Sequence, residues 1–118
     1  MGDPVRTLLA AEQNDIIKEE GLINCAVTVG DYFKSQMANV EAEYPTWVSN
    51  VRGLGLCLAF DVPNDDAMGT RRNLLVGQLK KRGVNVPVCG AYTVRARPCL
   101  YFEEKHVDVY IEVLRQTI

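Results

Sequence analysis

Two arginines separated by one residue are the clearest candidates for chemistry in this sequence. They lie in the run Thr93-Val94-Arg95-Ala96-Arg97-Pro98. Side chains of an extended segment alternate between its two sides, so Arg95 and Arg97 are expected to point the same way. A guanidinium binds a planar carboxylate through two parallel hydrogen bonds. The residues alone favour a solvated surface pair, and an anion site is the functional alternative.

Other reactive combinations are not expected in this chain. His106 is the single histidine, which leaves too little material for a Ser-His-Asp triad. Gly53-Leu54-Gly55 lacks the third glycine of a dinucleotide loop and leads into a strand instead of a helix. The cysteines form no CxxC pair and predict four reduced thiols, not a zinc site or a disulfide framework: Cys25, Cys57, Cys89 and Cys99. The residues alone therefore predict no triad, no dinucleotide loop and no metal site here.

The lysines are expected to be solvated surface charges. A lysine that forms a Schiff base needs a desolvated or otherwise perturbed setting. All five fall on predicted helices or at helix ends, among other charged residues: Lys18, Lys34, Lys80, Lys81 and Lys105. None of them is a good candidate for holding a carbonyl cofactor.

Four helices are predicted around these residues. The first begins at Asp3-Pro4, where Asp can cap and Pro suits the first helical position, and ends at Gly21. The second covers about 22–42, and the third follows the turn at 63–66 and ends at Gly83. The last begins at 103–104. The apolar stripe of the second helix is expected to be Ile23, Ala26, Val27, Gly30, Phe33, Met37 and Val40.

The segment Val51–Val62 predicts one buried strand near the centre of a sheet. Its large apolar residues would share one face: Leu54, Leu56, Leu58, Phe60 and Val62. Its smaller residues would share the other, where a backbone or helix packs closely: Gly53, Gly55, Cys57, Ala59 and Asp61. The two glycines could also mark a bulge. Shorter strands are predicted at 84–88, 93–96 and 99–102, with Pro98 excluding a fully paired central strand at that point.

These elements predict one α+β domain over residues 1–118, a two-layer arrangement with a small, largely antiparallel sheet flanked by helices. The formal net charge of -2 and the pI near 5.4 argue against nucleic acid or an anionic membrane as the main partner. No apolar run is long enough for a transmembrane span, and the first residues do not form a signal peptide.

Taken together, three segments resemble the C-terminal domain of class III pyridoxal-phosphate (PLP) aminotransferases. They are Gly2-Asp3-Pro4 before a helix, Val51-Arg52-Gly53-Leu54-Gly55 before an apolar strand, and Gly83-Val84 followed by Cys89-Gly90 and Val94–Leu100. Within that class the chain is most similar to the 4-aminobutyrate aminotransferases of eukaryotic type, which share the Cys-Gly and Arg-x-Arg-Pro pattern. The resemblance covers nearly all 118 residues.

The resemblance implies one substrate-binding residue. Arg95 matches the arginine that binds the α-carboxylate of glutamate and 2-oxoglutarate in this family, whereas Arg97 matches no catalytic role. The parent enzyme is expected to transfer the amino group of 4-aminobutyrate to 2-oxoglutarate, which gives succinate semialdehyde and glutamate. The PLP lysine, the pyridine-binding aspartate and the phosphate site belong to the large domain of the family, so this chain alone is expected to be inactive and to hold no cofactor.

The same resemblance implies the partners and the location. The large PLP-binding domain of the same polypeptide would be the main partner, with small amino and keto acids as substrates and a homodimer as the assembly. The location would be the mitochondrial matrix. The alternative, from a different class, is an autonomous non-enzymatic α+β module that binds a small carboxylate or a protein.

Overall fold

The computed structural model describes residues 2–63 and 66–118. Along the chain the elements are α1 (Pro4–Glu19), α2 (Leu22–Glu43), β1 (Ser49–Leu54), β2 (Cys57–Asp61), α3 (Thr70–Lys81), β3 (Val88–Cys89), β4 (Thr93–Ala96) and α4 (Glu104–Thr117). The predicted α+β class with an antiparallel sheet and helices is confirmed. None of the described helices combines the length and the apolar character that crossing a membrane requires.

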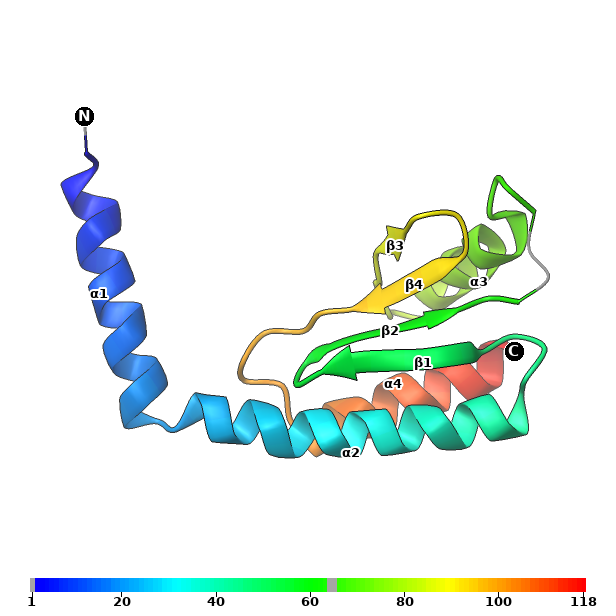
Figure 1. Ribbon diagram of the computed structural model, residues 1–118, viewed down its shortest axis with the longest axis horizontal. Helices are drawn as coiled ribbons and strands as arrows, with labels where there is room; N and C mark the ends of the chain where they lie inside the picture. The colour runs from blue at the N-terminus through cyan, green and yellow to red at the C-terminus, as the bar shows by residue number, and fades with distance from the viewer. Residues whose placement is uncertain (1, 64–65) are drawn as a thin grey trace.

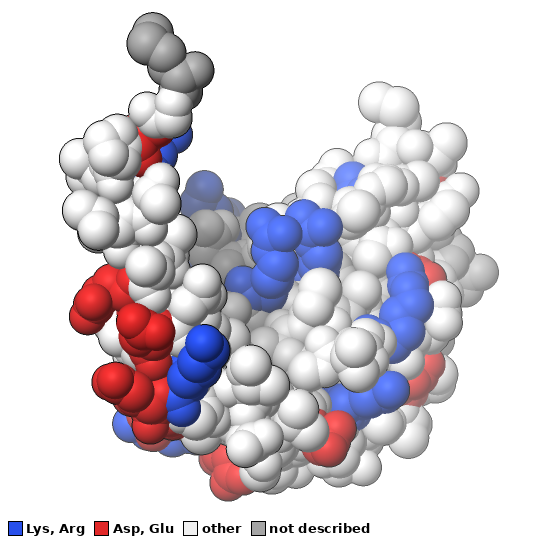
Figure 2. All heavy atoms as spheres, turned by 60° about the vertical axis from the view of Figure 1, so that its left-hand side comes forward, with Lys and Arg blue, Asp and Glu red and all other residues white. Residues whose placement is uncertain are grey.

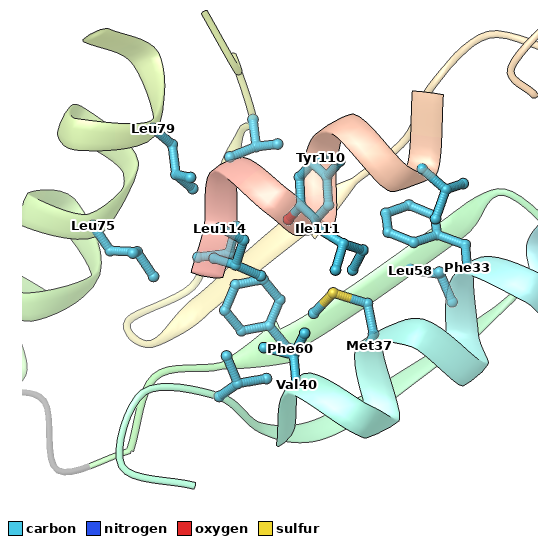
Figure 3. Packing of buried hydrophobic residues seen from close by; sticks show 14 of the residues in the cluster. Phe33, Met37, Val40, Leu58, Phe60, Leu75, Leu79, Tyr110, Ile111 and Leu114 are labelled. Atoms are coloured by element: carbon cyan, nitrogen blue, oxygen red, sulfur yellow. The ribbon is translucent and has the colours of Figure 1, made fainter. Parts of the chain in front are cut away.

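The four described strands form one antiparallel sheet in the order β1-β2-β4-β3. Helices α2 and α4 run side by side along one side of it, and α3 packs against α4 and the β3–β4 end (Figure 1). The apolar core lies between these helices and the sheet. Figure 3 shows its members converging from α2, β2, α3 and α4, with Phe33 edge-on to Tyr110 at 5.2 Å between ring centroids.

The predicted single strand over Val51–Val62 is wrong, because the segment is a hairpin. Gly55 has φ +53°, a left-handed conformation that turns the chain between β1 and β2. The two halves then pair, with Arg52 opposite Ala59 and Leu54 opposite Cys57. The expected central position holds for β2, which lies between β1 and β4. Leu54, expected on the buried face, is 89% exposed at the hairpin tip.

The close packing expected at the small residues of this segment is confirmed at Gly55. A Cβ added to Gly30 of α2 would lie 2.4 Å from the backbone of Gly55, so the hairpin tip and the helix touch through two glycines. The bulge, in contrast, is not at the glycines. The β1–β2 register shifts between Ser49 and Arg52, where Asn50 has φ +53°.

Proline chemistry corrects the other predicted strands. Of the segment 84–88 only Val88 is in a strand, because β3 begins after Pro87, which has no N–H to donate. The segment 99–102 forms a turn instead of a strand, because β4 ends at Ala96 and Pro98 cannot continue the ladder. Asp66 of the predicted capping turn does accept a hydrogen bond from the backbone nitrogen of Thr70 at 2.9 Å. Residues 64 and 65 lie outside the described part.

The predicted helices are confirmed, but not all of their apolar residues are buried. The Asp3 carboxylate accepts from the backbone nitrogens of the first turn of α1, as a cap should. The α2 stripe is correct from Gly30 onward and wrong at Ile23 and Val27, which are exposed. Helix α1 buries none of its residues and projects from the rest of the molecule (Figure 1). Its apolar residues therefore take no part in this core.

Candidate functional site

Arg95 lies on the side of the sheet away from the helices. On β4 its neighbour Val94 is 0% exposed and belongs to the core, so the alternation of side chains directs Arg95 to the opposite face. Its main-chain nitrogen donates to Pro87 O at 3.0 Å, and its Cα pairs with that of Ala59 on β2. The ladder therefore fixes the base of the side chain.

The Arg95 guanidinium has an unmet hydrogen-bond requirement. Its Nε is buried and has no acceptor within the described chain, and it forms no ion pair with a described residue. A buried donor without an acceptor costs about 1–3 kcal/mol, and more when the group is charged. An arginine held in this state is suited to an acceptor that comes from outside these residues, and a carboxylate is the acceptor that fits its planar fork.

One other buried side-chain polar atom in the described part lacks a partner, the hydroxyl of Tyr110. Its surroundings are different, because Tyr110 packs among core side chains such as Phe33 and burial raises its pKa (Figure 3). A neutral phenol packed among apolar side chains is a poor partner for a charged ligand. Arg95 is thus the unsatisfied group that faces outward.

Arg97 does not share the position of Arg95. Because β4 ends at Ala96, the strand alternation does not extend to Arg97, and the expectation of a paired arrangement is not supported by the ladder. Arg97 is exposed and lines a separate hollow of about 220 Å³ with apolar residues of α2 and α4. His106, at the same hollow, accepts at Nδ1 from the Glu103 backbone and is part of the α4 cap.

A polar network stands next to Arg95 on the same face of the sheet. The Asp61 carboxylate accepts from Arg52 Nη2 at 2.9 Å, from Thr93 Oγ1 at 2.6 Å and from Asn50 Nδ2 at 2.8 Å. Burial acts to raise the pKa of Asp61, but the hydrogen bonds from Arg52, Thr93 and Asn50 outweigh it and hold the pKa below its usual value. Asp61 is therefore ionised at neutral pH.

The sequence patterns did not identify this network. In the sequence, Arg52 belongs to a motif shared with the family and Asp61 to the small-residue face of a predicted strand, and neither feature links the two residues. The three strands bring them together. Arg52, Ala59 and Arg95 are paired across β1, β2 and β4, and Asp61 pairs with Thr93 two residues along the strands. A hairpin at Gly53-Leu54-Gly55 was the signal that could have predicted it, because a turn there places Arg52 opposite Ala59.

The lysines and cysteines of the described residues are exposed. All five lysines are exposed on helices, as predicted, so none has the desolvated setting that a Schiff-base lysine needs. No group of three or more possible metal ligands is present in the described part. The four cysteines are unpaired and exposed, as expected for free thiols.

The concave side of the molecule is basic at its centre. Figure 2 shows lysine and arginine side chains at the floor of the hollow between the projecting α1 on the left and the right-hand side of the molecule. Acidic side chains gather at the base of α1. An anion that approaches this side meets positive charge, although the chain as a whole carries a net charge of -2.

Comparisons with known proteins agree on one family. The model of the aminotransferase class-III family matches residues 1–118. The chain is 36% identical over 119 residues to the 4-aminobutyrate aminotransferase of Saccharomyces cerevisiae, covering 99% of this chain and 24% of that protein. It is 35% identical over 113 residues to the human mitochondrial 4-aminobutyrate aminotransferase, covering 96% of this chain and 22% of that protein.

Solved structures give the same result. The lysine aminotransferase of M. tuberculosis superposes with a TM-score of 0.82 at 35% identity, over 88% of this chain and 23% of that one. An omega transaminase from Pseudomonas jessenii superposes with a TM-score of 0.86 at 26% identity, over 97% of this chain and 26% of that one. The chain thus spans about a quarter of the length of the proteins it matches.

Proposed function

Because this chain belongs to the class-III aminotransferase family, we propose that it is the C-terminal domain of a PLP-dependent transaminase. The parent enzyme transfers the amino group of 4-aminobutyrate to 2-oxoglutarate and yields succinate semialdehyde and glutamate. The curated relatives quoted above, named 4-aminobutyrate aminotransferases, support this choice of substrates. The span of about a quarter of those relatives supports its place within a longer polypeptide.

Arg95 binds the α-carboxylate of glutamate and 2-oxoglutarate in this proposal. The observation that carries it is the buried Nε without an acceptor, on a guanidinium that faces away from the core. Glutamate and 2-oxoglutarate have two carboxylates, whereas 4-aminobutyrate has one. The resemblance assigns Arg95 to the carboxylate that 4-aminobutyrate lacks, so its contribution differs between the two half-reactions.

The test is the change Arg95→Ala in the full-length enzyme, measured by single-turnover kinetics of each half-reaction. A charge-assisted bidentate pair contributes about 1.5–3 kcal/mol, which is roughly ten- to a hundredfold in binding. We expect a loss of that size with glutamate or 2-oxoglutarate and a much smaller one with 4-aminobutyrate. Arg95→Lys keeps the charge without the planar fork, so it should restore only part of the loss.

The matched control is Arg97→Ala, one residue beyond the end of β4. It should lower both half-reactions little and equally. Equal losses in both half-reactions for Arg95→Ala would mean that Arg95 has a structural role. An asymmetry at Arg97 instead would mean that Arg97, and not Arg95, binds the carboxylate.

PLP supplies the electron sink for amino transfer, and in this proposal the rest of the polypeptide holds it. The chain alone is then inactive. Mixing the chain with PLP, removing free cofactor and recording the visible spectrum should leave no stoichiometric absorbance. A retained band together with one modified lysine in the mass spectrum would contradict this.

Helix α1 is where we place the contact with the large domain. Its sixteen residues bury none of their side chains within this chain, and its first half exposes Val5, Leu8 and Leu9. Exposed apolar residues in a cluster mark a contact surface. Apolar-dye binding by the chain should fall when these three residues are changed to Gln.

The homodimer and the mitochondrial matrix location also belong to the proposal. The name of the human relative supports the location but not the homodimer.

A further inference from the structure

The two arginines of one cross-strand row differ in their partners. The pairing places Arg52 opposite Ala59 on β2, and Ala59 opposite Arg95 on β4. Directly opposed residues of an antiparallel sheet share a face, so both guanidiniums leave the sheet on the same side, with a small alanine between them. Two strand spacings separate their Cα atoms by roughly 10 Å, which is close enough for both to act on one small anion.

Arg52 is held by neighbouring groups. Its Nη1 donates to Asn50 O at 2.9 Å, and its Nη2 donates to Asp61 Oδ1 at 2.9 Å and to Thr93 Oγ1 at 3.2 Å. The side chain therefore reaches from β1 across β2 to a residue of β4. Its charge is compensated by the Asp61 carboxylate, although the side chain is still 43% exposed.

Thr93 links this pair to the strand that carries Arg95. Thr93 lies two residues before Arg95 on the same face of β4. Its hydroxyl donates to Asp61 and accepts from Arg52. The Arg52 guanidinium thus lies beside the Arg95 position while its charge is neutralised. Without a carboxylate at residue 61, two uncompensated cations would stand next to each other on this face.

We propose that Asp61 determines the specificity of the carboxylate site by occupying Arg52, which leaves Arg95 as the one available guanidinium of the row. The inference rests on the proposed role of Arg95 in binding a carboxylate. Asp61 thereby selects where the carboxylate binds, because an incoming anion finds a single uncompensated guanidinium in the row. Arg52 contributes shape and an internal ion pair but does not bind the substrate.

Loss of the Asp61 charge then has a defined sign. Asp61→Asn preserves the size and one of the two acceptor oxygens but removes the charge that compensates Arg52. A second positive charge beside Arg95, close to the surface, should tighten the binding of a small dianion about two- to fivefold at low ionic strength. Salt should reduce this gain, because the Debye length at physiological ionic strength is about 8 Å.

The experiment uses the full-length enzyme to which this chain is proposed to belong, labelled at arginine, with 2-oxoglutarate as the probe. Nitrogen–proton NMR spectra resolve arginine Nε–Hε groups, and the variants Arg52→Gln and Arg95→Gln assign the two signals. In the unaltered enzyme we expect the Arg95 signal to shift with 2-oxoglutarate while the Arg52 signal stays in place. In Asp61→Asn both signals should shift, with the tighter affinity given above.

The reciprocal variant Arg52→Gln completes a double-mutant cycle. It leaves Asp61 negative and uncompensated, so binding should weaken about two- to fivefold, and the double variant should return to the unaltered affinity. A purely structural network would not make the Arg52 signal respond to the ligand. Arg52→Gln alters a partly exposed side chain, so it keeps the inference testable if Asp61→Asn does not fold.

Two failures can be told apart. An Arg95 signal that does not move in the unaltered enzyme would overturn both the proposed carboxylate site and the role of Asp61. An Arg95 signal that moves, together with a silent Arg52 and an unchanged affinity in Asp61→Asn, would overturn the role of Asp61 alone. A shift of the Arg52 signal in the unaltered enzyme would also contradict the inference, because Arg52 would then be available with Asp61 in place.

Discussion

The two faces of the sheet differ in how their side chains are satisfied, and adjacent residues on β4 show the difference. Val94 is fully buried against the helices, where every contact it makes is supplied by this chain. Arg95 faces the other way and keeps a buried Nε without an acceptor. The helix-covered face is therefore complete within this domain, whereas the face with Arg95 lacks a partner. Such an incomplete face is what a domain that shares its site with another part of a protein should present.

Stability variants on the two faces give the largest expected contrast. Phe60→Ala on β2 removes a side chain that is 3% exposed within the core, and we expect a loss of about 3–5 kcal/mol in the free energy of unfolding. Arg95→Ala on the opposite face should not lower it and should raise it by up to about 1–3 kcal/mol, because no partner within the described chain is lost and a buried donor without an acceptor is removed. Urea unfolding monitored by circular dichroism measures both. Comparable losses would mean that Arg95 supports the fold.

The helix-covered face also depends on close backbone contact, and two helical glycines test this. An added Cβ at Gly30 would collide with the Gly55 backbone, so Gly30→Ala should cost about 1–3 kcal/mol. Gly77 of α3 has no atom within 4 Å of such a Cβ, and Gly77→Ala should stabilise by about 0.5–1 kcal/mol through helix propensity alone. A stabilising Gly30→Ala would show that the hairpin tip moves away from α2 without cost.

Local chemistry explains which parts of the fold could be predicted. The caps and glycine ends of the helices depend on neighbouring residues, so α1 and α4 were predicted at nearly their observed positions. The hairpin was missed because an apolar run with two glycines fits one long strand as well as two short ones. Its turn depends on the conformation of Gly55 and on its contact with Gly30, which is distant in sequence.

The candidate site divides in the same way. Arg95 was found from its motif, which lies within one short segment. The Arg52–Asp61–Thr93 network was not, because it depends on the register between β1, β2 and β4. The pattern could not predict the exposure of Ile23 and Val27 either. Helical spacing shows which residues share one face of a helix, but not how much of that face the sheet covers.

The smallest expected effect concerns acid, and it sharpens the contrast within the open face itself. The pKa of Asp61 is held below its usual value in the folded protein, because the hydrogen bonds from Arg52, Thr93 and Asn50 outweigh the effect of burial. A carboxyl group with a lowered pKa in the folded state stabilises the fold above its ordinary pKa, and that contribution is lost as the pH falls through the folded value. Arg95 lacks such a carboxylate among the described residues, so Arg95→Ala should leave the acid dependence unchanged.

The unaltered chain and Asp61→Asn should therefore differ most near neutral pH and converge in acid. The difference at pH 7 should be less than about 1 kcal/mol, the size of a partly exposed ion pair, and should shrink between about pH 5 and pH 2. Other carboxyls with lowered pKa values, Asp66 and Glu103, are common to both proteins, so the difference between their stability curves isolates Asp61. A constant difference over this range would mean that Asp61 acts through its shape and not through its charge. Because charge is also what occupies Arg52, such a result would weaken the case for a role of Asp61 in selecting the carboxylate position.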